Sequence, residues 1–307
     1  MKSFGDRMSC ELPDACGNDQ REESLLTVQQ KDDGRSRIQR VLERDKILLG
    51  ACVAMILLMN IDTGRYLLYP FKLFATWVHE MSHGIAAKLT GGKIGVLKIF
   101  PDASGSCVYY YDGTPWKGAF VSSAGYTGTA FWGGILLLFR RTVLGPTIGT
   151  IGFGLAILLS CALYVRNQFG LIVLGIEGVF LLLCGWFLPA FWLDNLYAFF
   201  AVTCSMNALL DIKNLYGSSQ GYVGGELSAT DAHVVSEYWG NDYRFWATCW
   251  LIFAIVMTFI GIVFARDAKE LFWKKSNTGS NSTTVTGDNS SSTTNQPIGK
   301  YHWAQVV

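Results

Sequence analysis

Apolar residues occur in long runs along this chain, and short polar segments separate the runs. Most runs hold about 15 to 25 residues, and a helix needs about 20 to cross a membrane. They predict seven apolar helical segments, at 47–61, 66–89, 117–139, 142–165, 169–188, 190–210 and 245–265. The charges beside these segments allow one of them to be re-entrant. The expected fold class is therefore an all-α polytopic membrane protein with about six to seven transmembrane helices.

A strand pattern interrupts the helical segments after the second run. Residues 93–100 alternate loosely between apolar and polar, and residues 106–111 are rich in β-forming side chains. Pro101 to Gly105 lie between them and supply the turn, so a small β-hairpin is predicted here. Residues 213–243, between the sixth and seventh runs, are expected to form a polar loop.

Both ends of the chain are polar. Residues 1–45 are mixed in charge and contain no long apolar run, and residues 267–307 are rich in Ser, Thr and Asn. Segments of this composition cannot bury enough apolar surface to fold by themselves. We therefore expect three parts, which are a disordered N-terminal segment (1–45), a multi-pass membrane domain (46–266) and a disordered C-terminal tail (267–307).

Composition agrees with a membrane location and excludes some functions. Half of the residues are hydrophobic, 16% are charged, and the mean hydropathy is +0.26. The expected partner is the lipid bilayer, with no indication of which organelle holds the protein. No basic patch is interleaved with aromatic residues, so nucleic acid is not expected as a partner. The eight cysteines show neither a disulfide framework nor a Cys-x-x-Cys pair.

The second apolar run contains the motif His79-Glu80-Met81-Ser82-His83. Residues four apart share one face of a helix, so His79 and His83 can reach the same metal ion. Glu80 lies beside them and is placed to act as general base toward a water activated by the metal. Zinc lowers the pKa of a bound water to about 7, and Zn²⁺ is therefore the expected cofactor.

A third metal ligand is needed, since catalytic zinc usually has three protein ligands. Asp211 is favoured because it ends the sixth apolar run and Asn207 lies one helical turn earlier. Asn207 is expected to support a ligand or to contact substrate. Further candidates for the third ligand stay open in the apolar runs and the polar loop, namely Glu177, Asp194, Asp231 and His233.

The chain resembles the site-2-protease-like family of multi-pass membrane zinc metallopeptidases between residues 47 and 233. The resemblance rests on the metal motif in an apolar helix (79–83), the small residues after it (84–87), the Gly-Gly turn (91–92) with its hairpin, a small-residue helix (124–128) and the distal Asp211. Thr230-Asp231-Ala232 also resembles a Ser-Asp-Ala element from one branch of the family.

The resemblance implies that His79, His83 and Asp211 bind zinc and that Glu80 is the general base. The implied activity is cleavage of membrane protein substrates by zinc-activated water. Ser82 stands where better-known members have Gly, and Ile212 follows Asp211 where they have Gly. These departures keep open a proteolytically inactive membrane protein that retains the fold for client binding. A transporter or channel with a polar intramembrane site is a third interpretation.

Overall fold

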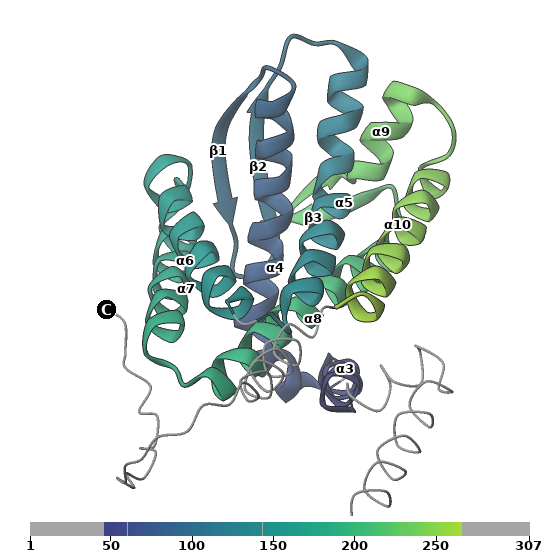
Figure 1. The fold of residues 1–307 in the computed structure, drawn as a ribbon. Coiled ribbons are helices and arrows are strands. Elements are labelled where there is room, and N and C mark those ends of the chain that lie inside the picture. The colour runs from purple at the N-terminus through teal and green to yellow at the C-terminus, as the bar shows by residue number, and fades with distance from the viewer. Residues whose placement is uncertain (1–45, 60, 143, 266–307) are drawn as a thin grey trace, which may run out of the picture. The chain divides into compact units, whose positions relative to one another are not determined.

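The computed structural model describes residues 46–59, 61–142 and 144–265 (Figure 1). Within these ranges the chain forms eight helices and two antiparallel two-stranded sheets. In chain order they are α3 (Lys46–Met59), α4 (Asp62–Leu89), β1 (Lys93–Ile99), β2 (Gly105–Tyr110), α5 (Pro115–Phe139), α6 (Gly145–Leu163), α7 (Gln168–Phe187), α8 (Ala190–Leu215), β3 (Gln220–Val223), β4 (Glu226–Ala229), α9 (Asp231–Trp239) and α10 (Tyr243–Val263). The segments predicted as disordered, 1–45 and 267–307, lie outside the described residues.

Four of these helices are long and apolar enough to cross a membrane, which supports an integral membrane protein. They are α6, α7, α8 and α10. The expected count of six to seven spans is not confirmed. Helix α3 has 14 residues, a length of about 21 Å, against a hydrocarbon core of about 30 Å. Helices α4 and α5 are longer, but they carry the polar and small residues that build the site described below.

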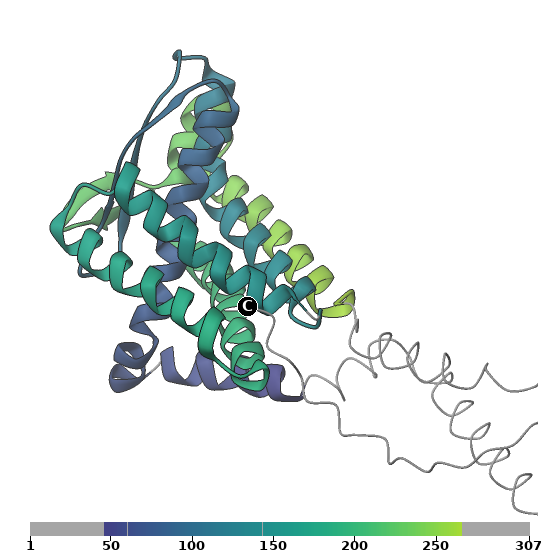
Figure 2. The same cartoon turned by 60° about the vertical axis from the view of Figure 1, so that its left-hand side comes forward.

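Helix α4 lies at the centre of the helices (Figure 1), in contact with α3, α5, α8 and the β1–β2 hairpin. Figure 2 shows α3 lying across one end of the others, while α6 and α7 run side by side. Helix α5 packs on α4, α8 and α10. Small residues allow this, since a side chain at Gly133 would overlap Ser205 and one at Gly134 would press on the backbone of Met257.

The predicted β-hairpin is confirmed. Strand β1 pairs antiparallel with β2, with Leu97 opposite Cys107. Its turn is tied to α4, because the Thr76 hydroxyl donates to the carbonyl of Ala103 at 2.9 Å. Its outer edge is held by the α6–α7 connection, where Val165 makes a parallel bridge with Leu97. The hairpin is therefore fixed on both sides and forms a wall beside α4.

The expected polar loop contains a second hairpin and a short helix, which the hydrophobic pattern did not reveal. Strands β3 and β4 are only four residues each, and every residue of β4 is exposed. Gly224 and Gly225 both have positive φ and form the two-residue turn, a conformation that glycine adopts without strain. The backbone N–H of Gly224 donates to the Ser104 hydroxyl at 3.0 Å, so the tip of this hairpin touches the turn of the first.

Candidate metal centre

The two histidines of the motif lie on one face of α4, as their spacing predicted. His83 is buried, and its Nδ1 lies 2.7 Å from the backbone carbonyl of Val121 on α5. Donation from Nδ1 to that carbonyl leaves the Nε2 lone pair of His83 directed at His79. A hydrogen bond of this kind sets the tautomer and ring orientation of metal-binding histidines.

The carboxylate beside the histidines belongs to Asp231, the first residue of α9. Its position depends on the closure of the β3–β4 hairpin. Thr230 donates from both its backbone N–H (3.0 Å) and its hydroxyl (3.1 Å) to the carbonyl of Ser219. The Thr230 hydroxyl also accepts from the N–H of His233 and caps α9. Asp231 therefore leaves the hairpin in a defined direction, toward α4.

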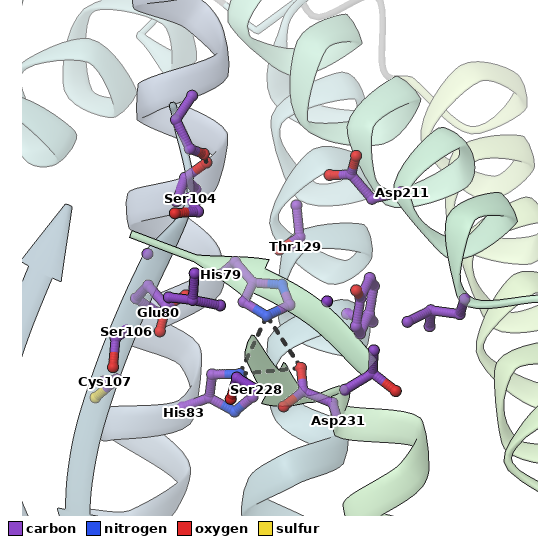
Figure 3. Close-up of a pocket in the computed structure, with 18 of the residues that line it drawn as sticks. His79, Glu80, His83, Ser104, Ser106, Cys107, Thr129, Asp211, Ser228 and Asp231 are labelled. Atoms are coloured by element: carbon purple, nitrogen blue, oxygen red, sulfur yellow. Dashed lines mark hydrogen bonds and ion pairs between the residues drawn. The ribbon is translucent and has the colours of Figure 1, made fainter. Parts of the chain in front are cut away.

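Nε2 of His79, Nε2 of His83 and Oδ2 of Asp231 form a nearly equilateral triangle (Figure 3). The two nitrogens are 3.1 Å apart, and Oδ2 lies 3.2 Å from His79 and 3.3 Å from His83. Tetrahedral zinc with bonds of about 2.0 to 2.1 Å separates its ligand atoms by about 3.3 to 3.4 Å. Among the described residues this is the group of His, Cys, Asp and Glu that could hold a metal. The donor types and spacing both suit zinc.

Helix α5 closes one side of this triangle with a glycine. A methyl group at Gly125 would overlap Nε2 of both His79 and His83. The next residue, Tyr126, sets its ring edge against His79 with centroids 4.7 Å apart and stacks on Trp250 of α10. Gly125 thus provides the space that the ligand atoms need, while Tyr126 restricts the orientation of His79.

Glu80 is buried and lines the same cavity without belonging to the triangle. Strand β2 comes very close to it, since a methyl group at Gly105 would lie 2.6 Å from Cγ of Glu80. This close packing of β2 restricts where the Glu80 carboxylate can lie beside the metal triangle, as expected of a general base.

The electrostatics of Asp231 reflect its two histidine neighbours. Burial acts to raise the pKa of the Asp231 carboxyl, but His83 and His79 outweigh this effect and hold the pKa well below its usual range. The side chains of His79 and Asp231 remain 20% and 25% exposed toward the cavity. The group therefore offers a charged carboxylate and an approach from the cavity side.

The cavity has a volume of ≈ 570 Å³, and α4, α5, α8, both hairpins and the start of α9 supply its walls. Asp211 and Asn207 of α8 line it, as does the triangle itself. Figure 3 shows Asp211 set apart from the three ligand atoms. The structure thus brings Asp211, the predicted third ligand, to the wall of the cavity but not into the group that could hold a metal, where Asp231 stands instead.

Asn207 is deeply buried, and neither atom of its side-chain amide has a hydrogen-bond partner among the described residues. Glu177 and Asp194, on α7 and the first turns of α8, do not line the cavity. His233 pairs with Glu237 at 3.4 Å on α9. Sequence reasoning favoured Asp211 and kept Asp231 only as an open candidate; the resemblance of residues 230–232 to a Ser-Asp-Ala element was a signal that could have favoured Asp231.

Two histidines and a carboxylate around a possible metal position, with a buried glutamate beside them, are typical of metallopeptidases. The sequence profile of the Peptidase M50B-like family matches residues 48–261. The chain belongs to this family, which agrees with the resemblance to site-2-protease-like enzymes. No curated protein and no solved structure matches the chain in the corresponding comparisons.

Proposed function

We propose that this protein is an intramembrane zinc metalloprotease that cleaves membrane protein substrates. His79, His83 and Asp231 hold the zinc, and Glu80 is the general base. The observation that carries the proposal is the triangle of ligand atoms, with sides of 3.1, 3.2 and 3.3 Å, beside the buried Glu80. Membership of a peptidase family supports the same activity.

Zinc at this position would polarise the scissile carbonyl and lower the pKa of water, which is the chemistry that peptide hydrolysis requires. Glu80 takes a proton from the attacking water and later gives it to the leaving amine. Strand β2 packs closely on the Glu80 side chain because Gly105 has none, and this restricts the carboxylate to the cavity. His83 is kept in the ligand tautomer by the Val121 carbonyl.

The walls of the cavity suit an extended peptide. Parts of β2 and β3 line it on different sides, and each is a strand of a two-stranded sheet with one unpaired edge. A substrate helix satisfies its backbone groups internally and must unwind before cleavage. An unwound segment could add to a strand edge through its backbone. Asn207 also lines the cavity, and its amide has two N–H donors and a carbonyl acceptor that are unpartnered among the described residues.

The proposal is tested by measuring bound zinc and peptide cleavage on detergent-purified protein. We expect about one zinc per chain by plasma mass spectrometry in the wild type and none in His83→Ala. Glu80→Gln should retain zinc but lose cleavage by about 100-fold or more. The cleavage probe is a synthetic transmembrane peptide with a fluorophore and a quencher, in versions with and without a central Gly-Pro pair.

Cleavage should be faster for the peptide with the Gly-Pro pair, because its helix unwinds more easily. A wild type without zinc would overturn the metal assignment. A third outcome is a wild type that binds zinc but cleaves neither peptide. If the wild type and Glu80→Gln then bind the peptides with equal affinity, the proteolytically inactive client-binding protein is favoured.

A further inference from the structure

A second cavity lies on another face of α4, away from the metal. It has a volume of ≈ 380 Å³ and is formed by α4, α5 and α6. No residue lines both this groove and the metal cavity. Trp77 and Met81 of α4, Trp132 of α5, and Gly152 and Phe153 of α6 are among its lining residues. The groove is thus a separate feature that the proposed protease does not use.

The floor of the groove consists of packed aromatic rings. The ring of Phe153 packs between Trp77, at 6.3 Å, and Trp132, at 5.5 Å, both in edge-on geometry. The indole N–H of Trp77 donates to the Ser160 hydroxyl at 2.9 Å, and that hydroxyl donates to the carbonyl of Ile157. These polar groups are already satisfied, so the surface favours a purely apolar occupant.

One wall of the groove is α6, which is one of the four helices long and apolar enough to cross a membrane. A side chain at Gly152 would meet nothing within 4 Å, so the groove is open at this point. An apolar groove on a membrane-spanning helix is exposed to lipid, and an acyl chain is the apolar ligand at highest local concentration there.

One end of the groove is positively charged. Tyr164 lines the groove, and the Lys88 ammonium lies over its ring at 5.9 Å. Arg166 follows at the end of α6, with its guanidinium on the carbonyls of Leu163 and Val165. Within the described part of the chain, neither Lys88 nor Arg166 forms an ion pair with a carboxylate. The charges of both cations are therefore not neutralised by a carboxylate of the described chain, although Arg166 also donates to backbone carbonyls.

We propose that this groove binds an anionic phospholipid, with an acyl chain on the aromatic floor and the headgroup phosphate at Lys88 and Arg166. The apolar floor selects the chain, and the two cations select the charge of the headgroup. Arginine and lysine both bind phosphate, and a tyrosine between floor and headgroup has the amphipathic character of residues at the membrane interface.

The test is the number of phospholipids that stay bound in native mass spectrometry. The purified protein is exchanged into detergent with dioleoyl phosphatidylglycerol or dioleoyl phosphatidylcholine. We expect one phosphatidylglycerol to be retained by the wild type at concentrations where phosphatidylcholine is lost. Gly152→Leu fills the groove and should lower retention by about 10-fold, since it overpacks the site of the chain.

Gly175→Leu is the matched control, because a side chain at Gly175 on α7 also meets nothing within 4 Å but lies outside the groove. It should leave retention unchanged. Lys88→Gln with Arg166→Gln should remove the preference for phosphatidylglycerol while Gly152 stays open. Equal retention by the two glycine variants would overturn the groove as the lipid site, and an unchanged preference in the double variant would overturn the headgroup assignment.

A second measurement locates the bound chain. Brominated phosphatidylglycerol quenches tryptophan within contact range, and Trp77 and Trp132 lie in the groove. In the wild type, brominated lipid should quench part of the tryptophan emission, and adding Trp132→Phe should remove that part. In Gly152→Leu the groove is filled, so adding Trp132→Phe should remove no quenched emission. Removal of the same part in both proteins would contradict a chain lying in the groove. Zinc content serves as a folding control, since no lining residue of the groove is a ligand.

Discussion

The candidate metal centre joins two regions that reach it in different ways. His79, His83 and Glu80 are neighbours on α4, and helical geometry alone puts them together. Asp231 lies 152 positions after His79 and arrives through a hairpin of two four-residue strands. The α4 half depends on local geometry, whereas the Asp231 half depends on the contacts that close and dock the β3–β4 hairpin.

This difference has a consequence for zinc affinity. A substitution on the outer surface of α4 leaves the spacing of the two histidines unchanged. A substitution that loosens the β3–β4 hairpin can move Asp231 without touching any ligand, because only tertiary contacts position it, namely hairpin closure and the packing of α9 on α5 and α10. We therefore expect the affinity of the centre to respond more to remote changes near Asp231 than to remote changes near the histidines.

The largest effect should come from Gly125→Val, which acts on the α4 half directly. The new side chain would overlap Nε2 of His79 and His83. Helix α5 cannot withdraw easily because it also packs on α8 and α10. We expect no measurable zinc in the purified protein. Gly175→Val is the control for a branched residue in a helix and should keep zinc; similar loss in both variants would contradict a steric effect at the site.

Asp231→Asn tests the other half of the centre and should have the next largest effect on zinc affinity. Mutating a residue that only supports a ligand typically costs 10- to 100-fold in metal affinity, so loss of the ligand charge should cost about 100-fold or more. Asp211→Asn should change affinity by less than about 3-fold, since Asp211 stands outside the triangle. Competition with a fluorescent zinc chelator measures both. The reverse order would restore Asp211 as the third ligand.

Thr230→Val should weaken zinc binding without removing a ligand. The variant loses the hydroxyl that caps α9 and bonds the Ser219 carbonyl. A lost N-cap costs about 1 kcal/mol, which corresponds to about 3- to 10-fold in zinc affinity if Asp231 shifts with it. Thr248→Val, which also loses hydroxyl bonds but lies outside the cavity, is the control. No difference between them would show that hairpin closure does not position Asp231.

Ser104→Ala should have the smallest effect. It removes the acceptor for the Gly224 N–H, which connects the two hairpins. A hydrogen bond contributes about 0.5 to 1.5 kcal/mol net, and only part of this should reach Asp231, so we expect about 2- to 3-fold weaker zinc binding. Thr248→Val, which lies outside the cavity, should be neutral here as well. Equal affinities for these two variants would mean that the hairpins hold their places independently.

The elements that could be predicted are those with a strong local signal. The long apolar runs located α6, α7, α8 and α10, and the strand pattern after the Gly-Gly turn located the β1–β2 hairpin. The second hairpin was missed because strands of four exposed residues carry no hydrophobic alternation. Two signals were nevertheless present in that segment, the Gly224-Gly225 turn and the Thr230 cap before α9.

The sequence alone determined the chemistry on α4, since a spacing of four residues in a helix sets both histidines on one face and Glu80 beside them. The sequence also showed that the motif lies within a long apolar run. Only the tertiary structure separates the two carboxylates, because Asp211 and Asp231 are equivalent as residue types and both line the cavity, while Asp231 alone belongs to the group that could hold a metal. The choice falls on Asp231 because hairpin closure at Ser219 and the space at Gly125 bring its Oδ2 within 3.3 Å of both histidines.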